Sequence, residues 1–336
     1  MKNVAILGAS GLVGQELLRI LAERRFPVRQ LKVLATSRSA GQTIEYMGEE
    51  LTIEEARPEA FEGVDIAFFA ASNDASRELA PEAVRRGCVV IDKSSYWRMD
   101  PEVPLAVPEV NPEAIRRHKG ILASPNCSTI QLVMALHPLK AAAGLRRVVV
   151  STYQSVSGTG KDAVEELRQQ APRVLQGDGV GPGRVYEKPI AFNVLARCDA
   201  FEANGYTKEE MKLTRETRKI LEMPDLPISA TAVRVPVFVG HSESVLVETG
   251  RPLSVEEARE ALRRQPGVVV VDDPERLEYP DALSAAGRDE VFVGRIREDL
   301  SAPGSLWMWV VSDNLRKGAA LNAVQIAEFL VQEGLA

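Results

Sequence analysis

The sequence predicts an α/β protein of two domains: a Rossmann-like N-terminal domain with a parallel-rich sheet, and an α+β second domain with a mixed or antiparallel sheet. Three observations indicate this. Short β-rich runs alternate with helical patterns over the first third of the chain, a glycine-rich turn follows the first run, and the later β-runs have few helical patterns between them. With 336 residues, 45% of them apolar, the chain is long enough to form two cores.

The first third is typical of βαβ units, whose strands lie parallel. Apolar residues at helical spacing between the first two β-runs predict an amphipathic helix over residues 11–24. The predicted strands of this domain are residues 4–7, 31–36, 65–71, 88–92, 105–110 and 121–125.

From about Thr129 the pattern changes, which marks the second domain. This domain is predicted to begin with a helix over 129–143. The Gly- and Pro-rich stretch 177–189 is predicted to be a loop within it. Its predicted strands are residues 147–156, 229–239, 244–249, 268–272, 291–296 and 306–311. A final helix over 317–332 is expected to pack back on the first domain, giving domains of 1–127 with 315–336 and of 128–314.

Composition favours small-molecule partners. A net charge of -6 without a basic run gives no reason to expect nucleic acid or a membrane surface. The first residues lack the pattern of a signal peptide and no apolar stretch reaches membrane-spanning length, so we expect a cytoplasmic location. Three cysteines, at 88, 127 and 198, form neither a disulfide framework nor a metal-binding pattern, and no metal is expected.

The stretch GASGLVG (8–14) follows the first strand and opens the first helix. Glycines there let backbone N–H groups and the helix N-terminus approach a pyrophosphate. The spacing GxxGxxG departs from the strict dinucleotide fingerprint, and a ligand-free tight turn is the alternative. The candidate cofactor-binding residues are Gly8, Ser10, Gly11, Leu12, Val13 and Gly14.

The end of the second strand indicates which dinucleotide binds. NAD-binding proteins usually place an Asp or Glu there for the ribose hydroxyls, whereas this chain reads LATSRSAG. Thr36, Ser37, Arg38 and Ser39 instead offer the hydroxyls and the guanidinium that a 2′-phosphate needs. The sequence therefore favours NADP over NAD, with a solvated surface Arg38 as the alternative.

The polar run SPNCST (124–129) places Cys127 directly before an apolar helix. A helix N-terminus stabilises a thiolate and so favours a nucleophile at this position. The alternative, a small buried hydrophobe, is the interpretation for Cys88 and Cys198.

Several longer motifs accompany these two: SSYWRMDPEVPLAVPEVN (94–111), TYQSVSGTG (152–160), NGYTKEEMKLTRETRKIL (204–221) and RVPVFVGHSESV (234–245). Together they span nearly the whole chain, which resembles the aspartate-β-semialdehyde dehydrogenases. The resemblance implies reductive dephosphorylation of an aspartyl phosphate to the semialdehyde and phosphate, with NADPH and a covalent thioester, in lysine, threonine and methionine biosynthesis. It also implies a homodimer.

The resemblance assigns roles to particular residues. Cys127 attacks the acyl phosphate, His241 is the acid–base group, which the chemistry requires to titrate near neutrality, and Gln154 orients the substrate or intermediate. The substrate's negative charges call for cations, and Glu209 would meet its α-ammonium, an ordinary surface ion pair with Lys212 being the alternative. The implied anion-binding residues are Arg234 for the carboxylate and Arg98, Asn126 and Lys212 for the phosphate. The implied residues near the nicotinamide are Ser157, Gly158 and Asn314.

Three other kinds of protein fit part of the pattern. N-acetyl-γ-glutamyl-phosphate reductases have a similar architecture, but their cysteine usually follows a glycine, and their acetylated amine has no use for Glu209. A phosphorylating glyceraldehyde dehydrogenase fits less well, because its cysteine context and its NAD-type acid are missing. A non-catalytic NADP-binding sensor protein would be expected to lose Cys127 first, yet Cys127, Gln154, Arg234 and His241 are all present.

Overall fold

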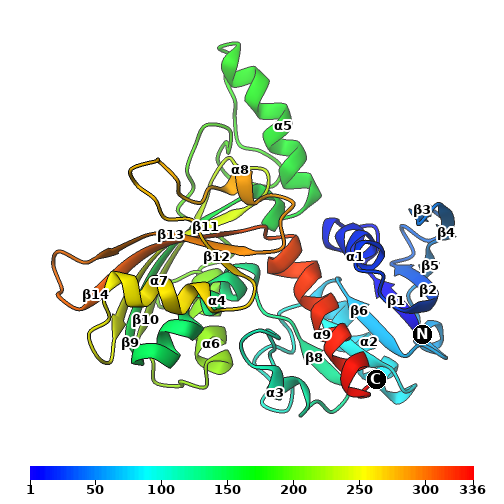
Figure 1. Ribbon diagram of the computed structural model, residues 1–336. Coiled ribbons are helices and arrows are strands. Elements are labelled where there is room, and N and C mark those ends of the chain that lie inside the picture. Colours follow the sequence, from blue (N-terminus) through cyan, green and yellow to red (C-terminus); the bar gives the residue numbers. More distant parts are fainter. The chain divides into compact units, whose positions relative to one another are not determined.

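The computed structural model describes residues 1–336 and divides the chain into two compact units. Unit 1 comprises Met1–Asn126 and Ala319–Ala336, and unit 2 comprises Cys127–Gly318. Figure 1 shows the helices and strands of both. No helix has the length and apolar character needed to cross a membrane.

Unit 1 is built on a six-stranded sheet in the order β5-β2-β1-β6-β7-β8. Every pair of neighbouring strands in it is parallel. The strands are β1 (Lys2–Leu7), β2 (Val28–Ala35), β5 (Glu54–Glu55), β6 (Ile66–Phe69), β7 (Val89–Asp92) and β8 (Ile121–Ala123). All residues of β6 and β7 are buried, and all but Asp92 are apolar, which is typical of strands inside a parallel sheet and confirms the predicted parallel-rich sheet.

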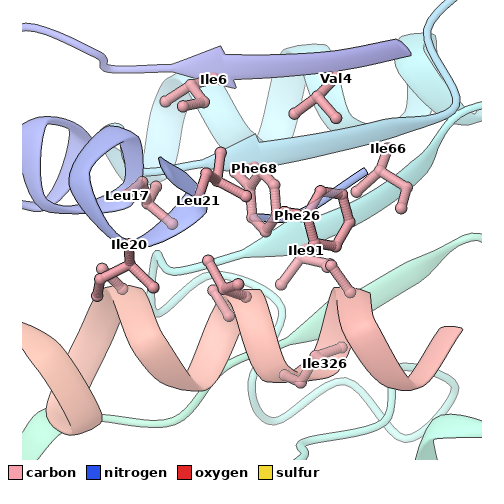
Figure 2. Close-up of a cluster of buried hydrophobic side chains, with 14 of the residues drawn as sticks. Val4, Ile6, Leu17, Ile20, Leu21, Phe26, Ile66, Phe68, Ile91 and Ile326 are labelled. Atoms are coloured by element: carbon pink, nitrogen blue, oxygen red, sulfur yellow. The ribbon is translucent and has the colours of Figure 1, made fainter. Parts of the chain in front are cut away.

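Helices supply the remaining structure of unit 1. They are α1 (Leu12–Glu23), α2 (Asn73–Arg85), α3 (Pro112–Ile115) and α9 (Leu321–Glu333), with a 3₁₀ turn at Pro58–Phe61 and a small hairpin of β3 (Thr43–Tyr46) and β4 (Glu49–Thr52). In Figure 2, α1 contributes Leu17, Ile20 and Leu21 to a buried cluster that also includes Ile326 of α9. Burying such a side chain stabilises the fold by about 1.5–3 kcal/mol. The final helix therefore packs on the first unit, as the sequence predicts.

The predicted strand over 105–110 is wrong. Only Leu105 forms an isolated bridge, to Ala123, and the chain then turns. The Asn111 side chain takes the place of a neighbouring strand, because its Oδ1 accepts from the Val107 N–H at 2.9 Å and its Nδ2 donates to the Leu105 carbonyl at 2.9 Å. With its backbone groups satisfied locally, the segment does not extend the sheet.

Unit 2 contains a second six-stranded sheet, in the order β10-β9-β11-β14-β13-β12. Its strands are β9 (Leu145–Gln154), β10 (Ile228–Arg234), β11 (His241–Thr249), β12 (Val268–Val270), β13 (Val291–Glu298) and β14 (Ser305–Ser312). The β10–β9 and β12–β13 pairs are parallel and the other pairs antiparallel, so the sheet is mixed, as expected.

The helices of unit 2 are α4 (Cys127–Ala143), α5 (Lys161–Leu175), α6 (Lys208–Ile220), α7 (Val255–Arg263) and α8 (Ala282–Ala285). Helix α4 contacts β9, β11, β13 and β14, α6 contacts β10, and α7 contacts β12 and β13. Along β11, His241, Glu243, Val245 and Val247 are buried at alternate positions. His241 and Glu243 therefore lie on the same buried face of the sheet as Val245 and Val247, which makes the start of this face polar and the rest apolar.

Several elements in the later part of the chain differ from the sequence prediction. The strand predicted over 229–239 ends at Arg234, because Pro236 has no N–H to donate and the backbone beyond it bonds to residues 156 and 157. Helices α5 and α7 were not predicted, since their mean hydropathy is low and only a few of their residues are buried. The terminal helix begins at Leu321, after a π-helical turn at Arg316–Ala320. The predicted loop over 177–189 is confirmed.

Candidate active site

Helix α4 begins at Cys127 itself, two residues before the predicted start at Thr129. The helix is apolar on all sides and most of it is buried, which fixes its first turn firmly in unit 2. Cys127 is half-buried, and the residues that follow it, Ser128 and Thr129, are fully buried. The Sγ atom therefore lies at the positive end of a 17-residue helix dipole, which favours negative charge on sulfur.

Gly318 lies against Cys127. A β-carbon at position 318 would be 3.0 Å from the Cβ of Cys127. The backbone at Gly318 is held there because its N–H donates to the Asp313 carbonyl at 3.0 Å. The Asp313 carboxylate fixes the turn in addition, accepting from the N–H groups of Leu315 and Arg316.

A continuous chain of hydrogen bonds runs from the first turn of α4 to α6. The Gln154 Nε2 donates to the Ser128 Oγ at 2.7 Å and to the Glu209 Oε1 at 3.1 Å. The Lys212 Nζ donates to the Glu209 Oε2 at 3.1 Å and to the Asp199 Oδ2 at 2.9 Å. Glu209 and Lys212 thus share a helix face, as their spacing predicted, but Glu209 is only 8% exposed, so this is not an ordinary surface ion pair.

The opposite charges of Lys212 and of the Glu209 and Asp199 carboxylates stabilise one another. Burial on its own would lower the pKa of Lys212, but the Glu209 and Asp199 carboxylates outweigh it and raise that pKa. Lys212 is therefore a cation at neutral pH. A capping box at the start of α6, formed by Thr207 and Glu210, fixes this helix end, and the Glu210 Oε1 also accepts from the Ala232 N–H of β10 at 2.9 Å.

Arg234 ends β10 directly beside Gln154, with which it pairs in the parallel register of β9 and β10. Its Nη1 donates to the Ser155 carbonyl at 2.7 Å. Its Nε is buried and has no hydrogen-bond partner. A buried guanidinium with an unused donor is a site for an anion that the protein itself does not supply.

His241 is fully buried at the start of β11. Its Nδ1 accepts from the Ser155 N–H at 3.1 Å, which assigns the proton of the neutral ring to Nε2. The Nε2 has no partner and lies against Gly158, where a β-carbon would be 3.0 Å from both Nε2 and the Arg234 Nη1. Gly158 thus gives the ring and the guanidinium the space that they occupy.

The sequence predicts that His241 titrates near neutrality, and the structure contradicts this prediction. Burial, with the Arg234 guanidinium acting in the same direction, lowers the pKa of His241 to about 3. The imidazole is therefore neutral in this structure. An anionic ligand on Arg234 would remove part of this effect and raise the pKa.

Asn314 organises the loop between β9 and α5. Its Oδ1 accepts from the Ser155 Oγ at 3.0 Å and from the Gly240 N–H at 2.9 Å, and its Nδ2 donates to the Ser157 Oγ at 2.9 Å. The residue is 3% exposed. The structure therefore brings Asn314 together with Ser157 and His241 through shared partners.

The glycine loop lies in unit 1, between β1 and α1. A β-carbon on Gly8, whose φ is +89°, would be 2.3 Å from the Ala70 carbonyl oxygen, and one on Gly14 would be 2.2 Å from the Gly8 carbonyl oxygen. Gly11 is the exposed N-cap of α1, and no side chain caps this helix. The backbone forms a cradle at a helix N-terminus whose first N–H groups have no protein acceptor, which fits a nucleotide pyrophosphate.

The segment after β2 lies at the carboxyl end of the strand next to β1. Thr36, Ser37 and Arg38 are exposed there and Ser39 is half-buried. The carboxyl edge of a parallel sheet at the β1–α1 turn is where doubly wound folds bind ligands. These side chains are thus on the same edge as the cradle.

Arg98 and Asn126, the other predicted anion-binding residues, belong to unit 1 and are buried. The Arg98 Nη2 donates to the Lys93 carbonyl at 2.8 Å. The Lys93 Nζ donates to the Ser124 Oγ at 3.0 Å and to the Pro125 carbonyl at 3.4 Å. These bonds hold the chain immediately before Asn126 and Cys127.

Sequence reasoning missed several residues of this arrangement. Ser155 connects Arg234, His241 and Asn314, and Ser128, Asp199 and Gly318 complete the surroundings of Cys127 and Lys212. Ser155 and Ser128 are next to predicted site residues in the motifs TYQSVSGTG and SPNCST, and Gly318 directly follows SDNLRK. Their position beside predicted residues is the one feature of the sequence that could have identified them. Nothing in the sequence around Asp199 pointed to Lys212.

The other cysteines are buried and unbridged. Burial raises the pKa of Cys88 to about 11 and that of Cys198 to about 12, so both are inert thiols near neutral pH. No cluster of three or more His, Cys, Asp or Glu side chains is arranged to hold a metal ion.

A Rossmann-like unit with a phosphate cradle and a second unit with a cysteine at a helix N-terminus define a nicotinamide-dependent oxidoreductase of the semialdehyde dehydrogenase class. Family comparison agrees: residues 3–118 match the semialdehyde dehydrogenase NAD binding domain, and residues 136–317 match the semialdehyde dehydrogenase dimerisation domain. Within this class, the chain belongs to the aspartate-semialdehyde dehydrogenases.

Individual relatives cover the whole chain. The aspartate-semialdehyde dehydrogenase of Aquifex aeolicus is 53% identical over 99% of both chains. The crystal structure of aspartate semialdehyde dehydrogenase II from Vibrio cholerae complexed with ASA has a TM-score of 0.95 and 44% identity, covering 99% of this chain and 98% of that chain. The Candida albicans aspartate semialdehyde dehydrogenase with NADP has a TM-score of 0.78 and 27% identity over 100% of both chains.

Proposed function

We propose that the chain converts L-aspartyl-4-phosphate to L-aspartate 4-semialdehyde and phosphate with NADPH, through a thioester on Cys127. The observation that carries this proposal is the connected set of side chains around the first turn of α4: Gln154 bonded to Ser128 and Glu209, and Ser155 bonded to both Arg234 and His241. We assign cofactor binding to residues 1–127 with 315–336, and catalysis and subunit pairing to residues 128–314.

The unit 2 residues have distinct parts in binding. The unused Nε of Arg234 is offered to the substrate carboxylate, since a guanidinium binds a carboxylate through parallel hydrogen bonds. Glu209 carries the negative charge that an α-ammonium requires, and Lys212 gives its cation to the phosphoryl group, which Arg98 and Asn126 also bind. Gln154, anchored by Ser128 and Glu209, orients the acyl group.

The reaction proceeds at the Sγ of Cys127. The thiolate attacks the acyl carbonyl, the C–O bond to phosphate breaks, and the thioester forms. When bound, a reduced nicotinamide would supply the hydride for the thioester carbonyl. The resulting thiohemiacetal collapses, releasing the semialdehyde and restoring the thiolate. The Nε2–H of neutral His241 is a donor for the developing oxyanion, and the ring takes or returns a proton more readily once an anion on Arg234 raises its pKa.

The assignment is tested by following NADP reduction with purified protein, aspartate semialdehyde and phosphate, in parallel with Cys127→Ala and with N-acetyl-glutamate semialdehyde. We expect activity with the first substrate alone and none in the variant. Activity with only the acetylated substrate would assign the chain to N-acetyl-γ-glutamyl-phosphate reduction. Cofactor binding without turnover of either substrate would contradict catalysis.

We propose NADP rather than NAD as the cofactor. Support comes from the exposed Arg38 on the cradle's edge of the sheet, from the absence of an acid among residues 36–39, and from the relative named with NADP. The ratio of kcat/KM for the two dinucleotides tests this proposal directly.

We also propose a homodimer that forms through the sheet of unit 2. The match to a dimerisation domain supports it, as does a groove of about 410 Å³ lined by Tyr153, Ser242, Arg297 and Trp309. The rings of Tyr153 and Trp309 lie 5.3 Å apart there. Light scattering on the purified protein should give twice the mass of the chain, and Trp309→Arg should give a monomer. A cytoplasmic location is part of the same proposal, and cell fractionation tests it.

A further inference from the structure

A buried carboxyl group that the reaction does not use lies next to the site. Glu243 follows His241 by two residues on β11, and it is 0% exposed. Neither of its carboxyl oxygens has a hydrogen-bond partner. A carboxylate in such surroundings is among the most unfavourable groups that a protein can bury, so its presence requires a reason.

Two more polar atoms near it also lack partners. Thr152 lies directly opposite Glu243 in the β9–β11 register, and its Oγ1 is buried without a hydrogen bond. The Nε2 of Gln131 on α4 is in the same condition, whereas its Oε1 accepts from the Ser312 Oγ at 2.6 Å. Val310 occupies the remaining position opposite Glu243, on β14. The side chains of Glu243, Thr152 and Gln131 thus lie on neighbouring elements, and small rotations would let them hydrogen-bond to one another.

No cation offsets the burial of this carboxyl group. Burial raises the pKa of Glu243 well above its ordinary value, and only the Gln131 amide opposes that rise. The titratable side chains at this end of the unit include His241 on β11, Arg234 on β10, Cys127 on α4, Glu209 on α6, and Asp313 and Lys317 after β14. None of them is a cause of the raised pKa of Glu243.

We propose that Glu243 is a positioning residue held as the neutral acid: its hydroxyl donates to Thr152, its carbonyl oxygen accepts from the Gln131 amide, and Gln131 thereby holds the Cys127 end of α4 against Ser312. The geometry supports the connection at both ends. Gln131 is four residues, one helical turn, beyond Cys127. Ser312 is paired with His241 in the β11–β14 register. A neutral acid satisfies the two open groups without leaving a charge in the interior.

The role rests on the proposed function of Cys127 as nucleophile, so the first test uses three variants. Glu243→Gln preserves shape and neutrality, and its kcat should stay within about threefold of wild type. Glu243→Leu removes the hydrogen bonds, and kcat should fall about tenfold or more while the KM for aspartate semialdehyde stays within about twofold, because Glu243 does not touch substrate. Val245→Ala, on the same face of β11, is the matched control: it loosens the strand but leaves Gln131 in place.

Three measurements need no turnover and therefore separate this proposal from the proposed function. Alkylation of Cys127 by iodoacetamide should slow in Glu243→Leu in proportion to its kcat, and not in Val245→Ala. Because the folded protein keeps a proton that the unfolded chain releases above its ordinary pKa, wild type should lose stability relative to Glu243→Gln as the pH rises from 5 to 8. The infrared spectrum of wild type should show the carbonyl band of a protonated acid, and Glu243→Gln should lack it.

Three results would overturn the proposal. If Glu243→Gln is inactive and has lost one limb of the pH profile, the carboxyl group ionises and transfers protons. If Glu243→Leu matches wild type in kcat and in alkylation rate, Glu243 positions nothing. If the stability difference between wild type and Glu243→Gln does not change with pH, the acid is not neutral in the folded state. Where Glu243→Leu fails to fold, Gln131→Leu replaces it, with the same expected fall in kcat and alkylation rate.

Discussion

The Cα of Gly318 faces the Cys127 side chain so closely that residue 318 has no room for a side chain: a β-carbon there would lie 3.0 Å from the Cβ of Cys127. Real Cβ contacts are almost never tighter than this, so a methyl group must move either the Cys127 side chain or the π-helical turn at Arg316–Ala320. The position of the Cys127 sulfur is thus determined in part by a residue with no functional group.

Gly318→Ala should therefore impair catalysis more than folding. We expect kcat to fall about tenfold, which corresponds to about 1.4 kcal/mol of lost transition-state stabilisation, and the alkylation rate of Cys127 to change with it. Gly179→Ala is the control, because a β-carbon there would meet no atom within 4 Å. Unchanged turnover in Gly318→Ala would show that the turn yields to the extra methyl group.

The glycines of the cradle should separate folding from cofactor binding. Gly14→Ala places a carbon 2.2 Å from the Gly8 carbonyl oxygen and should lower the melting temperature, because the backbone cannot move aside easily. Gly11→Ala meets only one atom within 4 Å, at 3.4 Å, so the fold should survive, while NADPH binding, followed by fluorescence, weakens about tenfold. Equal melting temperatures for the two variants would contradict this difference.

His241 should make the protein sensitive to mild acid. Its pKa in the folded protein, about 3, lies below the ordinary value of 6.5, so the unfolded chain takes up a proton before the folded one does. The stability that this provides is complete above pH 6.5 and is lost as the pH falls toward 3, by up to about 1.4 kcal/mol per pH unit. Urea unfolding of wild type and His241→Gln should show a stability difference that shrinks over this range and is constant above it. A difference that is independent of pH would mean that the ring is not buried as a neutral group.

Arg38 should govern the choice of dinucleotide. Arg38→Ala removes the guanidinium offered to a 2′-phosphate, and we expect kcat/KM for NADP to fall about tenfold or more with the value for NAD nearly unchanged. Arg29→Ala, which removes an exposed cation from the preceding strand β2, is the matched control. An equal loss with both dinucleotides would place Arg38 outside the 2′-phosphate site.

The sequence was sufficient for most elements because their signals are local. The strands β1, β6 and β7 carry uninterrupted apolar runs, and α1 carries its apolar residues at helical spacing. The error at 105–110 has a tertiary cause, since the Asn111 side chain satisfies backbone groups that a strand would have left for a neighbour. Amphipathic helices with few buried residues, such as α5, gave too weak an apolar pattern to be recognised.

Motifs identify the candidate site residues, but they do not show which of these residues hydrogen-bond to one another. Gln154 and Glu209 are 55 positions apart, and Ser155 and Asn314 are 159 apart, so nothing local connects them. The protonation of His241 was expected to lie near neutrality because the chemistry asks for it, whereas burial and Arg234 decide it in the structure. Environment, rather than residue type, sets that property.

The steric demands of Gly8 and Gly14 have a consequence for how this enzyme could be redesigned. The cradle is shaped by main-chain packing and would meet the diphosphate mainly through peptide N–H groups, which suit either nicotinamide dinucleotide equally. Discrimination must then come from side chains outside it, on a solvent-facing turn that tolerates change far better than the packed glycines do. Substitutions in that turn alone, whether designed or evolved, could therefore change the preference between NADP and NAD, while the glycine cradle for the diphosphate stays the same.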